Sequence, residues 1–109
     1  MCGRFVNLNK IEKLKKIFDI KKSQGKFDRT FSYNIAPSQE SIIIINNFSS
    51  FEIEEAKWGF KFLDKKLNIE KTIINSRIET INEKIMFKDS FVKRKCVIPA
   101  NGYYEWSIF

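Results

Sequence analysis

A cysteine directly follows the initiator methionine in the first segment, MCGRF. If Met1 is removed, Cys2 carries a free α-amine and a thiol on neighbouring carbons. This 1,2-aminothiol offers two nucleophiles at one residue, a chemistry that no internal cysteine can perform, because an internal nitrogen is an amide. The structural alternative is a cysteine in a frayed terminus with no role. The rest of the sequence decides between the two.

Three further segments combine polar and aromatic residues in unusual ways: Tyr33–Pro37, Asn75–Arg77 with Glu79, and Pro99–Trp106. Each has an ordinary interpretation. Asn-Ser-Arg is typical of a turn, and a glutamate between aromatic residues is typical of a strand residue that faces water. Glu79 is also a candidate ion-pair partner for an arginine. It is their combination with MCGRF that indicates a function.

Together the segments MCGRF, YNIAPSQ, KWGF, NSRIET and RKCVIPANGYYEW resemble the SOS response-associated peptidase family, whose members act on abasic sites in single-stranded DNA. They occur in the family's order and spacing, from the first residue almost to the last. The resemblance implies a DNA-damage function in which the terminal cysteine joins covalently to the abasic aldehyde. An α-amine with a pKa of about 7.7–8.0 is partly neutral at physiological pH and attacks an aldehyde. The neighbouring thiol then closes a five-membered thiazolidine.

The resemblance also implies roles for other residues. Asn75 orients the sugar or the Cys2 nitrogen, and Glu105 is the general acid/base. Arg4 and Arg77 hold phosphates beside the lesion. Pro37 and Trp58 are candidates for packing against bases or sugars, although a core position for Trp58 is an equal alternative.

Two features depart from the family pattern. The segment WGFKFLDKK lacks the usual proline-containing loop after the tryptophan. Family domains are also about twice as long, and their second half supplies a histidine that this chain lacks. Residues 1–109 are therefore interpreted as the N-terminal half of one domain, and a second polypeptide that supplies the missing half is a candidate partner.

Composition sets further limits. The chain has 109 residues, a net charge of +7 and two cysteines. The charge suits a polyanionic partner such as nucleic acid, and the resemblance implies single-stranded DNA, although the lysine-rich composition is also what an AT-rich genome encodes. With no apolar run of membrane-spanning length and no secretory leader, we expect a cytoplasmic protein with reduced thiols and no membrane association. Two distant cysteines without a histidine do not make a zinc site, so we expect neither metal nor cofactor.

The local pattern predicts an α+β fold, with antiparallel strands in an open, barrel-like sheet and peripheral helices. A helix is expected over Asn9–Ile20, with Asn9 as its N-cap and Glu12 at the capping-box position. Strands over Ile42–Ile45 and Phe51–Trp58 should form a hairpin. The remaining expectations are a loop over Lys21–Asp28, extended chain over Tyr33–Pro37, a helix or turn over Ile78–Phe87, and strands over Thr72–Ile74, Cys96–Ile98 and Tyr103–Trp106. Cys96 should be a small buried hydrophobe.

Two other functions use the same residues. One is an N-terminal-nucleophile peptidase in which the Cys2 thiol attacks a peptide and its amine serves as base. The other is a basic DNA-binding remnant without catalysis. Incubation with single-stranded DNA that carries one abasic site separates them, because only the leading interpretation predicts a crosslink.

Overall fold

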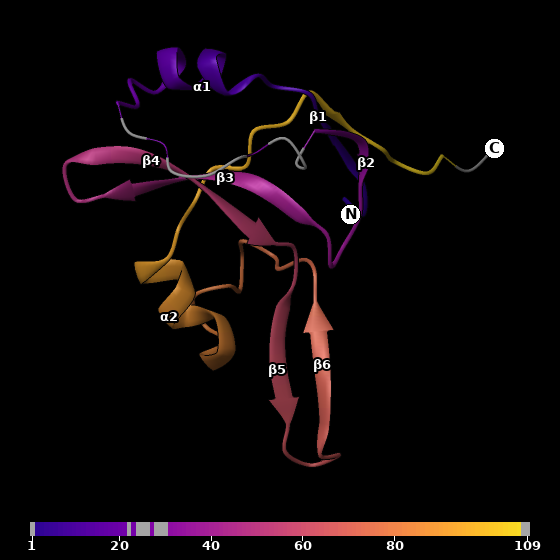
Figure 1. The fold of residues 1–109 in the computed structure, drawn as a ribbon. Helices are drawn as coiled ribbons and strands as arrows, with labels where there is room; N and C mark the ends of the chain where they lie inside the picture. The colour runs from indigo at the N-terminus through magenta and orange to yellow at the C-terminus, as the bar shows by residue number, and fades with distance from the viewer. Residues whose placement is uncertain (1, 22, 24–26, 28–30, 108–109) are drawn as a thin grey trace. The chain divides into compact units, whose positions relative to one another are not determined.

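The computed structural model describes residues 2–21, 23, 27 and 31–107, and it divides into two compact units. The first comprises Met1–Trp58 and Cys96–Phe109, and the second comprises Gly59–Lys95. Each unit combines short antiparallel sheets with one helix (Figure 1). The predicted α+β class is confirmed, and the described strands form no closed barrel.

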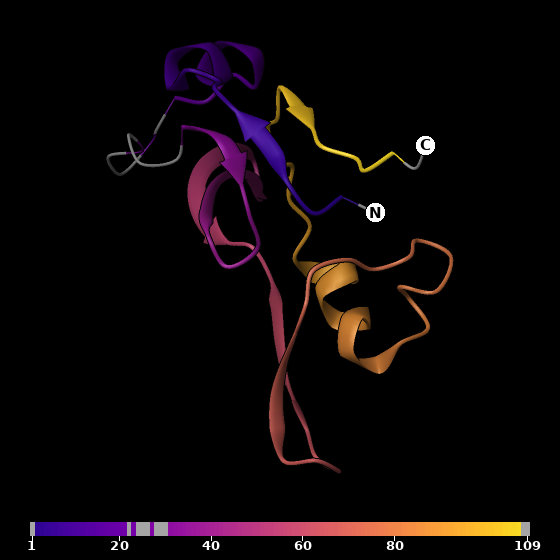
Figure 2. The ribbon, with the colours of Figure 1, turned by 90° about the vertical axis from the view of Figure 1, so that its right-hand side faces the viewer.

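A three-stranded antiparallel sheet carries both ends of the first unit. Strand β1 (Phe5–Asn7) lies between β2 (Ser32–Ile35) and β7 (Gly102–Tyr103). Phe5 pairs with Ile35 on one side and with Tyr103 on the other. The beginning and the end of the chain are thus neighbours in one sheet, which the second view also shows (Figure 2).

The long hairpin of the first unit pairs β3 (Glu40–Asn47) with β4 (Ser50–Lys57), as predicted. Its turn contains Phe48, whose φ of 56° lies in the left-handed region. Alternation of apolar and polar residues along β4 places Ile53 inward, opposite Ile44. The inward face of the hairpin is therefore apolar, and its burial requires another element to pack against it.

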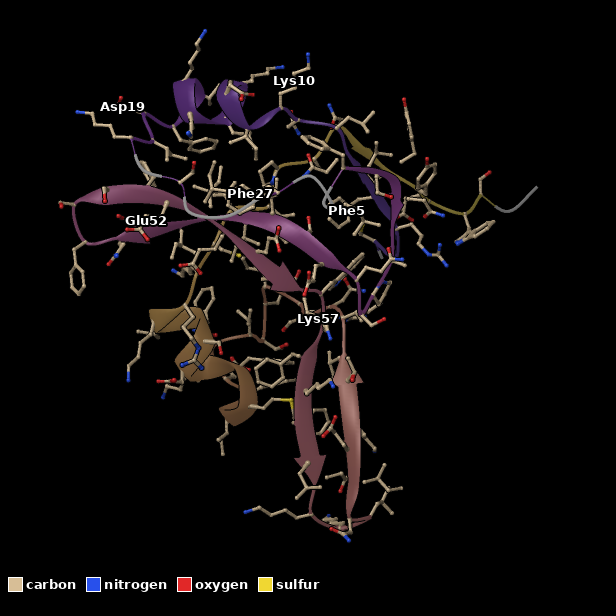
Figure 3. All side chains as sticks on the ribbon, in the orientation of Figure 1. Phe5, Lys10, Asp19, Phe27, Glu52 and Lys57 are labelled. Atoms are coloured by element: carbon tan, nitrogen blue, oxygen red, sulfur yellow. The ribbon has the colours of Figure 1, made fainter. Side chains whose placement is uncertain are left out.

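Helix α1 (Ile11–Ile17) covers part of this face. Its buried Leu14 belongs to one cluster with the hairpin residues, and Ile11 and Phe18 pack against this cluster. The helix is short because its apolar positions make one narrow stripe on a lysine-rich segment. Figure 3 shows Phe5 and Phe27 on the inner side of the unit, whereas Lys10 and Asp19 stand on its outer side. The cluster comprises Leu14, Ile20, Phe27, Ile42, Ile44 and Ile53.

The second unit pairs β5 (Phe60–Asp64) with β6 (Ile69–Ile73), followed by turns and α2 (Ile85–Lys93). Phe60 of β5 meets Phe87 of α2 with ring centroids 5.3 Å apart, which is the aromatic contact between strand and helix. Gly59 begins this unit at a φ of 137°, and a Cβ there would lie 2.8 Å from Thr72 Cγ2. Only glycine fits that position without strain.

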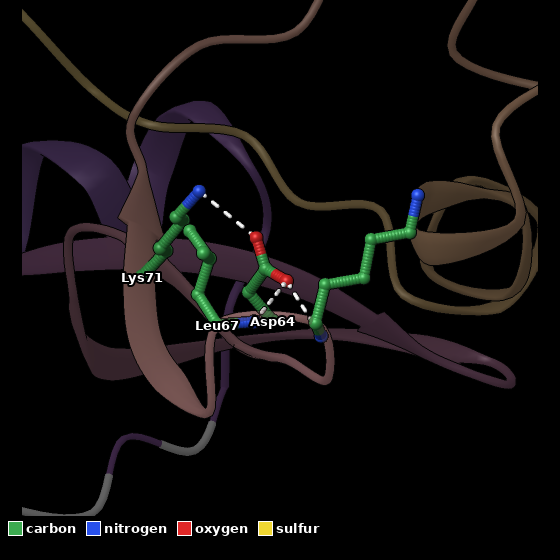
Figure 4. A network of polar contacts seen from close by, with 4 residues as sticks. Asp64, Leu67 and Lys71 are labelled. Atoms are coloured by element: carbon green, nitrogen blue, oxygen red, sulfur yellow. Dashed lines mark hydrogen bonds and ion pairs between the residues drawn. The ribbon is translucent and has the colours of Figure 1, made fainter.

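The network around Asp64 closes the β5–β6 hairpin (Figure 4). Its Oδ1 accepts the backbone N–H groups of Lys66 at 3.0 Å and Leu67 at 3.3 Å, while its Oδ2 lies 2.9 Å from Lys71 Nζ. The side chain thus satisfies turn donors that the ladder leaves unpaired. The hydrogen bond from Lys71, followed by that from Leu67, lowers the pKa of the Asp64 carboxyl.

Several local predictions were wrong in their details. Asn9 is not the N-cap: α1 begins after Lys10, and the Asn9 amide donates instead to Asn7 at 2.9 Å and to Asn101 at 3.2 Å. By contrast, the helix or turn predicted over Ile78–Phe87 is confirmed, since turns occupy residues 78–83 and α2 begins at Ile85. The predicted Lys21–Asp28 loop lies partly outside the described residues.

The strand predictions near the end of the sequence were too long. Of Cys96–Ile98 only Val97 pairs, through one isolated bridge to Ile44. Of Tyr103–Trp106 only Tyr103 belongs to β7. Cys96 is exposed rather than buried, and the strand predicted around it is reduced to the single bridge at Val97. Strand β5 was not predicted, because a glycine directly after Trp58 is typical of the end of a strand rather than of the start of a new one.

Candidate functional site

Cys2 and Glu105 flank the same hydrogen-bonded pair of residues. The backbone N–H of Tyr104 donates to the Arg4 carbonyl at 3.0 Å, which extends the β1–β7 pairing beyond Phe5 and Tyr103. Cys2 lies two residues before Arg4, and Glu105 lies one residue after Tyr104. Antiparallel pairing therefore brings these two sequence-distant predicted site residues to one end of the sheet. Cys2 is half-buried and Glu105 is exposed.

The Arg4 side chain is held across the same sheet. Its Nη1 donates to Asn34 Oδ1 of β2 at 3.1 Å, and the residue itself is exposed. A guanidinium has five N–H donors, so this bond leaves others for a phosphate. The Cys2 thiol makes a long contact of 3.6 Å with the Arg4 carbonyl. The MCGRF segment is thus ordered by local and cross-strand bonds.

The Tyr104 side chain connects the segment after β7 to β2. Its hydroxyl donates to the Tyr33 carbonyl of β2 at 2.8 Å. Because β1 lies between β2 and β7, this bond bridges over the central strand. Together with the backbone bond to Arg4, it fixes the residue that precedes Glu105 at two points.

Pro37 and Trp58 lie in neighbouring segments of the first unit. The N–H of Ser38 donates to the Trp58 carbonyl at 2.9 Å, and the Trp58 N–H donates to the Gln39 carbonyl at 3.0 Å. Both Pro37 and Trp58 are half-buried. The Trp58 ring packs on Phe5 with centroids 5.4 Å apart, so this side chain contributes to the core and keeps an accessible part.

Asn75 and Arg77 follow β6 in the second unit. Asn75 is half-buried, whereas Arg77 is exposed, and the Arg77 carbonyl accepts the Thr80 N–H at 3.3 Å. They therefore sit at the start of the turns that lead to α2. The predicted meeting of Asn75 with Cys2 and Glu105 stays a prediction.

Aromatic side chains are exposed on and beside the three-stranded sheet. Tyr33 is 71% exposed, Tyr103 67%, Tyr104 48% and Trp106 95%. Exposed aromatic faces next to an arginine suit the stacking of unpaired bases. An exposed apolar set of this kind also suits contact with another polypeptide.

Sequence reasoning missed two asparagines. Asn7 is fully buried in β1, and Asn101 precedes Gly102 in an Asn-Gly pair, which is typical of a turn. Asn101 Oδ1 accepts the Leu8 N–H at 2.6 Å, and the Asn101 N–H donates to the Val6 carbonyl at 2.8 Å. The only signal was the Asn-Gly pair, which predicts a turn but no partner.

Two other groups have shifted pKa values, one in each unit. Desolvation raises the pKa of the Cys96 thiol. A hydrogen bond from Lys93, with the charges of Lys93 and Arg94, lowers the pKa of Asp89 on α2. In the part of the chain that the structure describes, no cluster of three histidine, cysteine, aspartate or glutamate residues could hold a metal ion. Within the same residues no helix has the length and apolarity to span a membrane.

Comparison with known proteins gives a consistent result. A family profile described as SOS response associated peptidase (SRAP) matches residues 1–108. The chain is 38% identical to the abasic site processing protein YoaM of Bacillus subtilis, over 97% of this chain and 47% of that protein. It is 33% identical to YobE of the same organism, over 97% of this chain and 49% of that protein.

A more distant relative is the abasic site processing protein YMR114C of Saccharomyces cerevisiae, which is 31% identical over 69% of this chain and 21% of its own length. The chain spans about half the length of the bacterial relatives it matches. Among solved structures there is no significant match.

Proposed function

The chain belongs to the SOS response-associated peptidase family, and from this premise we propose that it processes abasic sites in single-stranded DNA by linking Cys2 covalently to the lesion. The observation that carries the proposal is the Tyr104–Arg4 hydrogen bond, which brings the segments of Cys2 and Glu105 together. Relatives named abasic site processing proteins support the choice of substrate. The proposed setting is the cytoplasm, where thiols stay reduced.

The proposed reaction begins once Met1 has been removed. The Cys2 amine adds to C1′ of the ring-opened deoxyribose and forms a carbinolamine. Loss of one water gives an imine, and the Cys2 thiol then adds to the same carbon while its proton moves to nitrogen. The product is a thiazolidine plus one water, with no change of oxidation state. Ring closure is favoured because the thiol is already held beside the imine.

Glu105 and Asn75 have separate roles in this scheme. Glu105 protonates the departing hydroxyl of the carbinolamine and accepts a proton during opening of the sugar ring. Its position after Tyr104, in the segment paired with MCGRF, supports this role. Asn75 orients the sugar or the amine. Asn75 follows β6 in the second unit, so its role toward Cys2 rests on the family resemblance.

DNA contacts would come from both arginines and from accessible ring faces. Arg4, already oriented by Asn34, holds a phosphate beside the lesion, and Arg77 holds another. Pro37 and the accessible part of Trp58 pack against sugars or bases. Unpaired bases offer their faces for such stacking, which favours single-stranded DNA over a duplex.

We further propose that a polypeptide equivalent to the second half of the bacterial relatives completes the site, either in the same chain or as a second molecule. The relatives are about twice as long as the matched region. The exposed aromatic residues beside β7 give such a polypeptide an apolar surface to cover. A peptidase or lyase activity of the completed protein uses the same Cys2 and Glu105.

The test is a crosslinking assay with single-stranded DNA that carries one abasic site. The chain is incubated alone and together with the remaining half of YoaM, and the products are separated on a denaturing gel. A slower band that mass spectrometry maps to Cys2 is the expected result. Binding without any crosslink, even with the added half, would leave the DNA-binding interpretation in place of this one.

A further inference from the structure

We propose that Asn101 and Tyr104 are positioning residues that hold Glu105 in register with Cys2. This inference rests on the proposed function and deepens it. The two residues stand on either side of β7, and each is bound to a part of the sheet outside that strand. Neither touches the reacting atoms in the scheme above.

The need for such residues follows from the length of β7. The strand has two residues, Gly102 and Tyr103, and both are exposed. A strand is held in register by the burial of one face, because a slip of one residue moves every side chain to the other face. A two-residue strand without a buried side chain has no such constraint. A slip of one residue would shift Glu105 by one position relative to Cys2 and turn its side chain to the other face.

Asn101 provides the constraint before the strand. Its Oδ1 accepts from the Leu8 N–H at 2.6 Å and from Asn9 Nδ2 at 3.2 Å, and its own N–H donates to the Val6 carbonyl at 2.8 Å. Asn9 is in turn fixed, since its backbone N–H and its amide both donate to the Oδ1 of buried Asn7. Asn101 is therefore tied to β1 and to the segment that follows β1.

The buried Asn7 side chain connects this network to β1. It is 0% exposed, and its Nδ2 has no hydrogen-bond partner among the described residues. A buried donor without an acceptor is unfavourable. Against this cost stand the two hydrogen bonds that the Asn7 Oδ1 accepts from Asn9. What the side chain provides is a fixed Oδ1 that orients Asn9 toward Asn101.

Tyr104 provides the constraint after the strand. Its backbone N–H is bound to Arg4, and its hydroxyl is bound to the Tyr33 carbonyl of β2. With Asn101 at one end and Tyr104 at the other, the register of β7 is determined from outside the strand. Glu105 follows directly, so its position is set by the second of these anchors.

The test is a double-mutant cycle on the full chain, under the conditions that give the Cys2 adduct. General acid–base groups contribute about 10²–10⁴-fold, and we expect Asn101→Ala to lose part of this, about tenfold or more in adduct formation rate. Asn101→Asp keeps both acceptor bonds and should stay within about twofold of the unchanged chain. In the Glu105→Gln background, Asn101→Ala should cause no further loss, because there is no proton-transferring carboxyl left to misplace. Asn46→Ala, at the far end of β3, is the matched control.

Tyr104→Phe keeps the ring and removes only the hydroxyl, so it keeps the test valid if Asn101→Ala fails to fold. It should show the same dependence on Glu105, and both variants should speed hydrogen exchange at the Tyr104 amide. Equal losses with and without the Glu105→Gln substitution, or unchanged exchange, would overturn the inference while the proposed function stands. Failure of the unchanged chain to form any adduct, alone or with the added half, would overturn the proposed function itself.

Discussion

Cys2 carries two reactive groups that act on one carbon atom only when its nitrogen is an amine. The proposed thiazolidine needs both groups, whereas a peptidase mechanism needs only the thiol as nucleophile. The chain contains one other cysteine, Cys96, which is exposed and whose thiol pKa is raised by desolvation. Substitutions at these two residues therefore separate the two mechanisms.

Replacing Cys2 with serine should weaken the DNA adduct without abolishing imine formation. The amine is retained, but a hydroxyl is a poorer ring-closing nucleophile than a thiol. We expect an adduct that borohydride traps and that otherwise decays with strand cleavage. Keeping Met1 in place should remove the adduct at Cys2 entirely, because the nitrogen then remains an amide. Cys96→Ser is the matched control and should leave adduct yield unchanged; a loss as large as that of Cys2→Ser would contradict the role of the terminal residue.

Among the helices and strands, those whose formation depends on residues close in sequence could be predicted. A run of four isoleucines, a second strand-like segment and the turn between them were enough for the β3–β4 hairpin, and an apolar stripe was enough for α1. The parts that could not be predicted depend on distant partners. Asn9 does not cap α1, because its side-chain amide donates to Asn7 and Asn101 instead. The pairing of β7 with β1 follows from contacts across almost the whole chain, so no local pattern shows that the segments of Cys2 and Glu105 adjoin paired strands.

The β5–β6 hairpin should depend on Asp64 in a pH-dependent way. The folded-state pKa of Asp64 is lowered, mainly by Lys71, so its stabilising effect is present above the unfolded pKa of about 3.9 and is lost as the pH falls through the folded value. Asp64→Asn keeps the Oδ1 acceptor for the turn and loses the ion pair, whereas Asp64→Ala loses both. We expect the alanine variant to be the less stable, with the difference between the unchanged chain and Asp64→Asn shrinking below about pH 4. Urea unfolding followed by NMR signals of β5 and β6 measures this.

The control for that series is Glu70→Gln, which removes an ion pair on the same hairpin. Lys61 and Glu70 lie 3.4 Å apart with most of each side chain in water, so their pair should contribute little. A loss of stability as large as that of Asp64→Asn would show that charge alone, rather than the turn geometry at Asp64, holds the hairpin.

Over the whole molecule, a net charge of +7 attracts DNA regardless of where the lesion lies. Diffuse attraction and a specific phosphate contact differ in their salt dependence. Every phosphate that a protein neutralises on single-stranded DNA adds about 0.7 to the slope of log affinity against log salt. The orientation of Arg4 by Asn34 makes Arg4 the residue at which a specific contact is expected.

Arg4→Gln should therefore reduce the magnitude of this slope by about 0.7, the value for one phosphate on a single strand. Lys88→Gln removes the same charge from an exposed position on α2 and should change the slope by much less. Fluorescence anisotropy with a tetrahydrofuran analogue of the abasic site measures binding without the covalent step, because the analogue has no aldehyde. If both substitutions lower the slope equally, the charge acts only as a diffuse field and the phosphate role of Arg4 is wrong. If only Arg4→Gln does, the guanidinium beside Cys2 binds the DNA backbone at the place where the terminal amine must meet the sugar.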